Sequence, residues 1–135
     1  MTDIKRLLII DDNTTADLIC RHFVRKDYPE IIVCSFTEPA KALEFIKNEH
    51  NTCPLQTAVL LDINMPVLSG WEVLEELEVI TKFVQEHFSI YIFSSSINDE
   101  DKELSRNHPL VAGFIEKPLT SKKLATMISE EKAIN

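Results

Sequence analysis

The chain has 135 residues, of which 44% are hydrophobic and 27% are charged, as expected for one ordinary globular domain. Its formal net charge of −8 argues against nucleic acid as the main partner, because phosphate binding depends on Lys and Arg. The N-terminal apolar run is too short for a signal-peptide core or a membrane span. We therefore expect a single domain over residues 1–135, with its core at about residues 5–130, in the cytoplasm and away from membranes.

The three cysteines, Cys20, Cys34 and Cys53, show no CxxC spacing and no accompanying histidine cluster. Cys20 and Cys34 fall within helical and strand patterns, so they are predicted to be buried free thiols. Free thiols are typical of a reducing compartment, which agrees with a cytoplasmic location.

The first two strands and helices are predicted from two apolar runs and two helix caps. Leu7–Ile10 is a near-continuous apolar run, typical of a strand buried on both faces of a parallel sheet. Asn13 can cap the helix that follows. The run Ile31–Phe36 contains polar residues and is predicted to form an edge strand, and Thr37 is predicted to cap the second helix.

The third strand and helix have the clearest sequence signals. Ala58–Leu61 is predicted to be a strand. Ser69 and Glu72 form a capping-box pattern, and apolar residues at helical spacing continue from there to Val84. We expect one helix over this stretch.

The last part of the chain holds two further strands and two further helices. The apolar runs Ile90–Phe93 and Val111–Ile115 are predicted to be strands. Asn98 opens a short, very polar fourth helix, and Thr120 caps the fifth helix. Five strands alternating with five helices predict an α/β fold with a parallel sheet covered on both faces.

Polar groups follow four of these strands at the point where each one ends, and such ends meet at one edge of a parallel sheet. Asp11 and Asp12 follow the first strand and Asp62 follows the third. Adjacent carboxylates repel one another unless a cation joins them. With a backbone carbonyl near Asn64, they would supply the oxygen ligands that Mg²⁺ prefers.

The same edge would carry the groups needed to handle a phosphoryl group. A carboxylate such as Asp62 can act as a nucleophile and form an aspartyl phosphate. Lys117 would supply positive charge and Ser94 a hydroxyl donor for the phosphoryl oxygens. Each residue alone fits a simpler role, such as a loop aspartate bonded to backbone amides, a surface lysine or a backbone-bonded serine. Their arrival at one edge favours the phosphoryl site.

These motifs resemble those of response-regulator receiver domains of two-component systems. The chain resembles in particular the single-domain receivers that are similar to chemotaxis regulators. The resemblance covers about residues 5 to 130. The segments that carry it are Leu8-Ile9-Ile10-Asp11-Asp12, Leu61-Asp62-Ile63-Asn64-Met65-Pro66 followed by Gly70, Ile92-Phe93-Ser94-Ser95, and Phe114-Ile115-Glu116-Lys117-Pro118.

The resemblance implies a flavodoxin-like doubly wound sheet of five parallel strands in the order 2-1-3-4-5, with five helices. It implies that Asp62 accepts a phosphoryl group from a sensor histidine kinase or a histidine phosphotransfer protein. Asp12, Asp62 and the Asn64 carbonyl would bind Mg²⁺ directly, and Asp11 mainly through water.

For the other site residues, the resemblance implies that Lys117 contacts the phosphate and that the Lys117–Pro118 bond is cis. Ser94, preferred over Ser95, would be the switch hydroxyl. Phe114 takes the place of the aromatic residue, often tyrosine, that turns inward on activation. The output partner, whose identity is unknown, would bind the face formed by the fourth helix, fifth strand and fifth helix.

Three other functions remain open at this point. A haloacid-dehalogenase-like phosphatase also uses an aspartate and Mg²⁺, but it needs an Asp-x-Asp motif that neither Asp12 nor Asp62 provides. A flavodoxin-type carrier needs a hydroxyl- and glycine-rich loop after the first strand. A non-phosphorylated pseudo-receiver would lack the full acceptor set. We expect a signalling protein, not an enzyme, that catalyses only its own phosphorylation and dephosphorylation.

Overall fold

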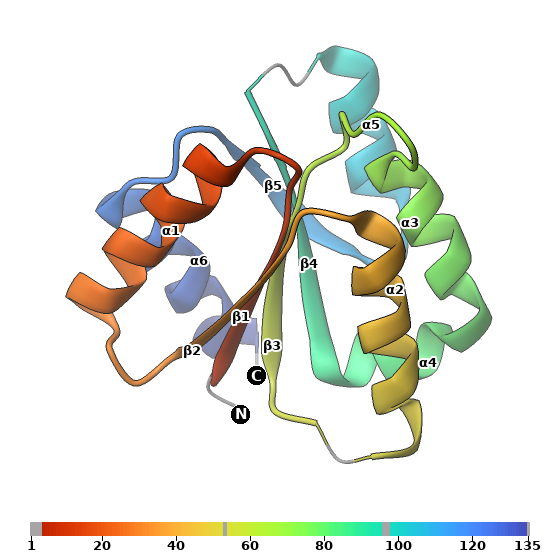
Figure 1. Cartoon of the computed structure of the whole chain (residues 1–135), viewed down its shortest axis with the longest axis horizontal. Helices are drawn as coiled ribbons and strands as arrows, with labels where there is room; N and C mark the ends of the chain where they lie inside the picture. Colours follow the sequence, from red (N-terminus) through yellow and green to blue (C-terminus); the bar gives the residue numbers. More distant parts are fainter. Residues whose placement is uncertain (1–3, 53, 96–97, 135) are drawn as a thin grey trace.

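The computed structural model describes residues 4–52, 54–95 and 98–134. A five-stranded parallel sheet in the order β2-β1-β3-β4-β5 is covered by helices on both faces (Figure 1). The flavodoxin-like fold and its strand order are confirmed, and β2 is an edge strand as predicted. Among the described residues, no helix combines the length and apolar character needed to cross a membrane.

The strands lie where the apolar runs predicted them, but polar residues extend several of their ends. The strands are β1 (Arg6–Ile10), β2 (Ile32–Phe36), β3 (Thr57–Leu61), β4 (Phe88–Ser94) and β5 (Val111–Glu116).

Alternate residues of the central strands pack into two separate cores. Leu7 and Ile9 of β1 face α1 (Thr14–Asp27) and α6 (Ser121–Ile134), in a core that includes Val24 and Leu124. Leu8 and its alternate neighbours face the opposite side. That second core is closed by α2 (Pro39–Asn48), α3 (Gly70–Leu77) and α4 (Thr81–His87). Each central strand is therefore buried on both faces, which explains its near-continuous apolar sequence.

Four of the five predicted helix caps are confirmed. The side chain of Asn13 accepts a hydrogen bond from the Thr15 amide, and Ser69 forms its capping box. Asn98 caps α5 (Asp99–Asn107), and Thr120 Oγ1 accepts from the amide of residue 123 in α6. The prediction that Thr37 caps the second helix is wrong.

Proline decides where the second helix begins. The N-cap is Glu38, because Pro39 occupies the first helical position, where its fixed φ and missing N–H are tolerated.

The predicted third helix is interrupted in the structure. It forms as α3, the 3₁₀ turn η2 (Glu78–Ile80) and α4 in succession, since the Thr81 hydroxyl donates to the Glu78 carbonyl at 2.7 Å. A further 3₁₀ turn, η1 (Glu49–Asn51), follows α2.

Gly70 is required where α3 begins. A Cβ atom at this position would lie 2.6 Å from the carbonyl oxygen of Asp62 and 2.8 Å from Cα of Ile63. Only glycine allows the first turn of α3 to approach the main chain after β3 this closely. The glycine therefore fixes α3 against the loop that carries Asp62.

The two described cysteines are free thiols, but only one is buried. Cys20 is buried in α1, and burial raises the pKa of its thiol to about 12. Cys34 is half-buried, so its predicted full burial is wrong, because the edge strand β2 is covered less completely. Cys53 lies outside the described residues.

Candidate functional site

The register of the sheet brings Asp11 and Asp62 side by side. Ile10 at the end of β1 pairs with Leu61 at the end of β3, so the next residue of each strand reaches the same edge. The Asp62 amide donates to the Ile10 carbonyl at 2.9 Å, and the Asp11 amide donates to the Phe36 carbonyl at 3.0 Å. Main-chain hydrogen bonds therefore fix both aspartates.

Each of these aspartates uses one carboxylate oxygen to order the loop that follows it. Asp11 Oδ1 accepts from the Asn13 amide at 2.9 Å, and Asp62 Oδ1 accepts from the Asn64 amide at 3.0 Å. Such local turns are common for aspartate. They orient the carboxylates and leave the Oδ2 atoms for other interactions.

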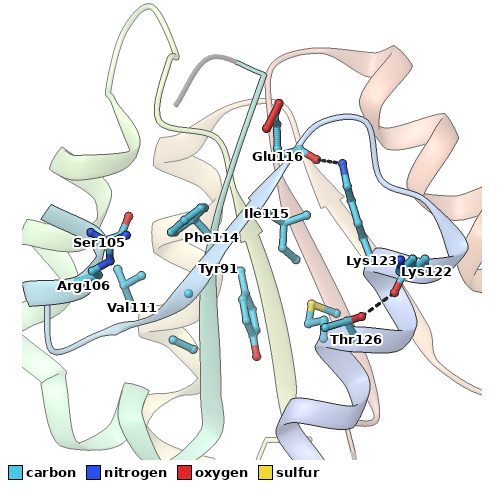
Figure 2. Close-up of a pocket in the computed structure, with 13 residues that line it drawn as sticks. Tyr91, Ser105, Arg106, Val111, Phe114, Ile115, Glu116, Lys122, Lys123 and Thr126 are labelled. Carbon is cyan, nitrogen blue, oxygen red and sulfur yellow. Dashed lines mark hydrogen bonds between the residues drawn. The ribbon is translucent and has the colours of Figure 1, made fainter. Parts of the chain in front are cut away.

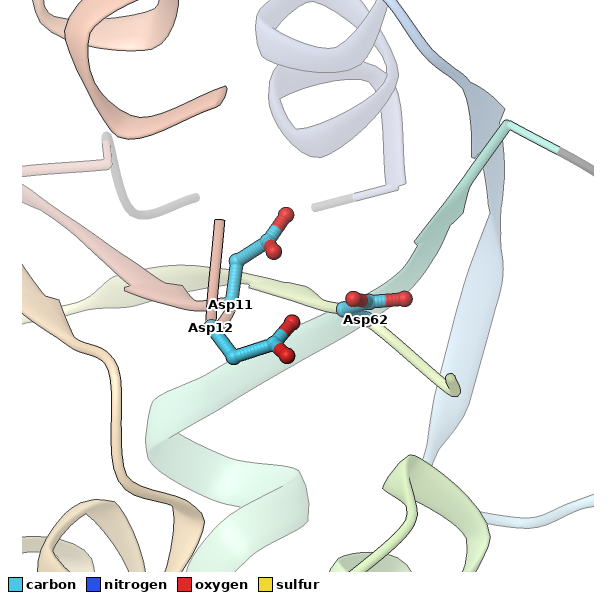
Figure 3. A group of neighbouring side chains, drawn as sticks. All are labelled: Asp11, Asp12 and Asp62. Carbon is cyan, nitrogen blue, oxygen red and sulfur yellow. The ribbon is translucent and has the colours of Figure 1, made fainter. Parts of the chain in front are cut away.

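Asp11, Asp12 and Asp62 form a three-carboxylate cluster. One ligand oxygen from each lies within 4.8 Å of the others, and Figure 3 shows the side chains grouped at the strand ends. Asp11 and Asp62 are buried, whereas Asp12 is exposed. Three carboxylates at this spacing fit a hard divalent cation such as Mg²⁺, because it prefers oxygen ligands and keeps several waters. The exposed side of Asp12 leaves room for those waters.

Lys117 provides the positive charge at this edge. Its Nζ atom lies 2.6 Å from Asp11 Oδ2 and 3.7 Å from Asp62 Oδ2. Asp11 Oδ2 is buried, so it makes this ion pair away from solvent. The Lys117 ammonium also lies 5.3 Å from the centre of the Phe93 ring, within cation–π range. The peptide bond between Lys117 and Pro118 is cis, as predicted.

The environment of Asp62 raises its pKa from 3.8 to about 6. Burial is the largest cause, and the nearby charge of Asp11 adds to it. The hydrogen bond from the Asn64 amide and the charge of Lys117 act in the opposite direction. Near neutral pH this carboxylate is charged but poorly solvated, which suits a group that must react with or bind a cationic or electrophilic partner.

Ser94 and Phe114 lie on the neighbouring strands β4 and β5. Ser94 ends β4 and is buried, and Asn64 Nδ2 donates to its Oγ at 3.3 Å. Ser95 is exposed. Phe114 of β5 is half-buried, with Lys102 Nζ of α5 lying 5.8 Å from its ring centre.

Several contacts of the site were not predicted from the sequence. They include the bond from Asn64 to Ser94, the ion pair of Lys117 with Asp11, and the position of Lys102 over Phe114. The ion pair could have been inferred from the opposite charges at adjacent strand ends. The contact of Lys102 has no sequence signal, because a flexible lysine on a polar helix has many alternatives.

A family model for the response regulator receiver domain matches residues 7–129. The chain is also 30% identical over 116 residues to the Arabidopsis thaliana protein ARR13, whose name describes a two-component response regulator. That match covers 84% of this chain but only 18% of the relative.

Solved structures with the same fold include two bacterial proteins. A two component response regulator from Cytophaga hutchinsonii has a TM-score of 0.86 at 20% identity, covering 97% of this chain and 98% of its own. A response regulator receiver protein from Dyadobacter fermentans has a TM-score of 0.81 at 21% identity, covering 93% and 95%. At these identities the likeness establishes the fold.

Proposed function

The chain belongs to the response regulator receiver domain family, and from this premise we propose that it accepts a phosphoryl group on Asp62. The observation that supports this most directly is the grouping of Asp62 with Asp11, Asp12 and Lys117 at one sheet edge. The donor is a phosphohistidine on a sensor histidine kinase or a histidine phosphotransfer protein.

In the proposed reaction, an Oδ atom of Asp62 attacks the phosphorus of the phosphohistidine in line with the P–N bond. The O–P bond forms as the P–N bond breaks. The electron pair of the broken bond goes to the imidazole nitrogen, which then takes a proton from solvent. The products are an aspartyl phosphate and a neutral histidine.

The charge of the transferring group is balanced by the residues around it. Asp12, Asp62 and the backbone carbonyl of Asn64 would hold Mg²⁺ directly, with Asp11 acting mainly through water. When bound, Mg²⁺ neutralises the carboxylates and the phosphoryl oxygens. Lys117 exchanges its contact with Asp11 for one with a phosphoryl oxygen.

The proposed switch begins at Ser94, whose hydroxyl turns to donate to the new phosphoryl group. Phe114 then occupies the space that Ser94 leaves. This shifts the equilibrium of the face formed by α5, β5 and α6. That face holds a groove of about 780 Å³, lined by residues that include Arg106, Val111 and Met127. An output protein would bind there.

We further propose that residues 5–130 act as one receiver domain in the cytoplasm, where a kinase can reach Asp62. The domain would catalyse only its own phosphorylation and dephosphorylation. The family match over residues 7–129 favours neither the haloacid-dehalogenase-like phosphatase nor the flavodoxin-type carrier.

Replacement of the acceptor tests the proposal. Wild type and Asp62→Asn would be incubated with acetyl phosphate and Mg²⁺, and the phosphorylated fraction measured by mass spectrometry. Asp99→Asn, which removes an exposed carboxylate on α5, is the control. We expect labelling of wild type and the control but not of Asp62→Asn. Labelling of Asp62→Asn at the wild-type rate would show that another residue is the acceptor.

A further inference from the structure

Lys123, in the first turn of α6, binds two main-chain carbonyls of the preceding turn. Its Nζ atom donates to the Glu116 carbonyl at 2.7 Å and to the Pro118 carbonyl at 3.1 Å. Figure 2 shows Lys123 reaching from α6 to the end of β5. These two carbonyls belong to the residues immediately before and after Lys117. One ammonium group therefore joins the two sides of Lys117.

The position of this charge on the helix is unfavourable in itself. The amino end of a helix carries partial positive charge, so a cation in the first turn is disfavoured. The first turn of α6 holds Lys122 and Lys123 and no acidic residue. For Lys123 the two hydrogen bonds offset this cost, because a charged donor makes stronger bonds to carbonyls than a neutral one.

Lys117 itself is held at two further points. Its amide donates to the Ser94 carbonyl at 2.9 Å, which fixes its main chain to β4. Its ammonium contacts Asp11 and lies within cation–π range of the Phe93 ring. The main chain on the α6 side is held by Lys123. A small movement of this turn would displace the ammonium at the end of the long Lys117 side chain.

We propose that Lys123 is a positioning residue, which holds the turn after β5 so that the Lys117 ammonium reaches the phosphoryl group on Asp62. Lys123 does not touch the reacting atoms, and it acts through Lys117. The inference rests on the proposed function, since it assigns a role in phosphoryl binding. It predicts that loss of the Lys123 charge weakens the binding of a phosphoryl mimic while the carboxylate cluster keeps its affinity for Mg²⁺.

Three variants separate this role from a general structural one. Lys123→Met removes the ammonium and keeps the aliphatic stem, and Lys123→Arg keeps a charged donor that can bond both carbonyls. Lys122→Met is the matched control, because Lys122 is the exposed neighbour on the same helical turn and carries the same charge. Isothermal titration calorimetry would measure the Kd of Mg²⁺ alone and of beryllofluoride in saturating Mg²⁺. Acetyl phosphate would serve to measure the rate of Asp62 phosphorylation.

For Lys123→Met we expect the Kd of beryllofluoride to rise about tenfold and the phosphorylation rate to fall by a similar factor, because small misplacements of an orienting group are costly. The Kd of Mg²⁺ should change by less than about twofold, since its ligands lie on other loops. Lys122→Met should match wild type, and Lys123→Arg should recover most of the loss.

Two results would overturn the inference. One is a Lys123→Met protein that binds beryllofluoride as Lys122→Met does, and the other is a parallel loss of Mg²⁺ and beryllofluoride affinity, which indicates general loosening. If Lys123→Met does not fold, Lys123→Gln takes its place in the same comparison. Failure of wild type to bind beryllofluoride or to be phosphorylated would instead refute the proposed function.

Discussion

The buried charge of Asp62 is expected to destabilise the folded chain when no cation is bound. Asp62→Asn removes that charge and keeps the size of the side chain. Its side-chain oxygen can still accept the hydrogen bond from the Asn64 amide, now 3.0 Å from Oδ1. We therefore expect the variant to be more stable than wild type near neutral pH, although it should not accept a phosphoryl group.

The size of the effect follows from the pKa of Asp62. A rise from 3.8 to about 6 corresponds to a cost of at most about 3 kcal/mol for the charged form. This value already includes the attraction of Lys117, whose Nζ atom lies 3.7 Å from Asp62 Oδ2. The asparagine amide that replaces the carboxylate is itself a buried polar group whose desolvation carries a cost, so we expect a net gain of about 1–2 kcal/mol.

Urea unfolding at several pH values, without divalent cations, measures this gain. The folded-state pKa of Asp62 lies above the unfolded value, so protonation favours the folded state. The advantage of Asp62→Asn should be complete above about pH 6 and should disappear as the pH falls towards 3.8. Saturating Mg²⁺ should reduce this stability advantage, because the cation binds the wild-type cluster more tightly than the cluster of the variant. Equal stability of the two proteins at pH 7.5, or a gain that grows on acidification, would refute the reasoning.

Three other substitutions or reactions test separate parts of the structure. Gly70→Ala should lower the free energy of unfolding by about 2 kcal/mol in urea titrations, because the new Cβ would lie 2.6 Å from the Asp62 carbonyl; an unchanged midpoint would contradict the tight approach. Glu49→Gln should lower the free energy of unfolding by about 2 kcal/mol in the same titrations. The buried Arg6 guanidinium would lose the carboxylate whose two oxygens accept its hydrogen bonds at 2.6 and 3.0 Å. With its pKa raised to about 12, the Cys20 thiol should resist iodoacetamide at pH 8 in the folded protein and react only in urea, as read by peptide mass spectrometry.

The centre of the fold could be predicted from the sequence because its signals are local. Each apolar run marks a strand buried on both faces, and each strand end carries its polar residue to the same edge. For that reason the grouping of Asp11, Asp12 and Asp62 follows from the positions of the aspartates alone. The cap at Asn13 is equally local, since the side chain bonds an amide two residues away.

The differences arise where a distant partner decides the structure. Arg6 and Thr57 extend β1 and β3 although neither is apolar, because Arg6 Nε donates to Thr57 Oγ1 at 2.9 Å and both side chains can be buried. The interruption after α3 depends on the Thr81 hydroxyl, which competes for a helix carbonyl. No glycine or proline stands there to indicate a break in the helix. The two bonds of Lys123 likewise depend on a turn that exists only in the folded chain.

Unlike the rest of the domain, the site brings like charges close together, and this unfavourable arrangement would make it responsive to a bound cation. Two buried carboxylates next to a third are unfavourable on their own, and the ammonium of Lys117 contacts Asp11 more closely than Asp62. Asp62 is thus left charged, poorly solvated and incompletely paired. A bound cation would relieve this imbalance, because its positive charge offsets the repulsion among the carboxylates. The position of Lys117 is therefore decisive, because a displacement of its ammonium changes the charge balance around Asp11 and Asp62 together.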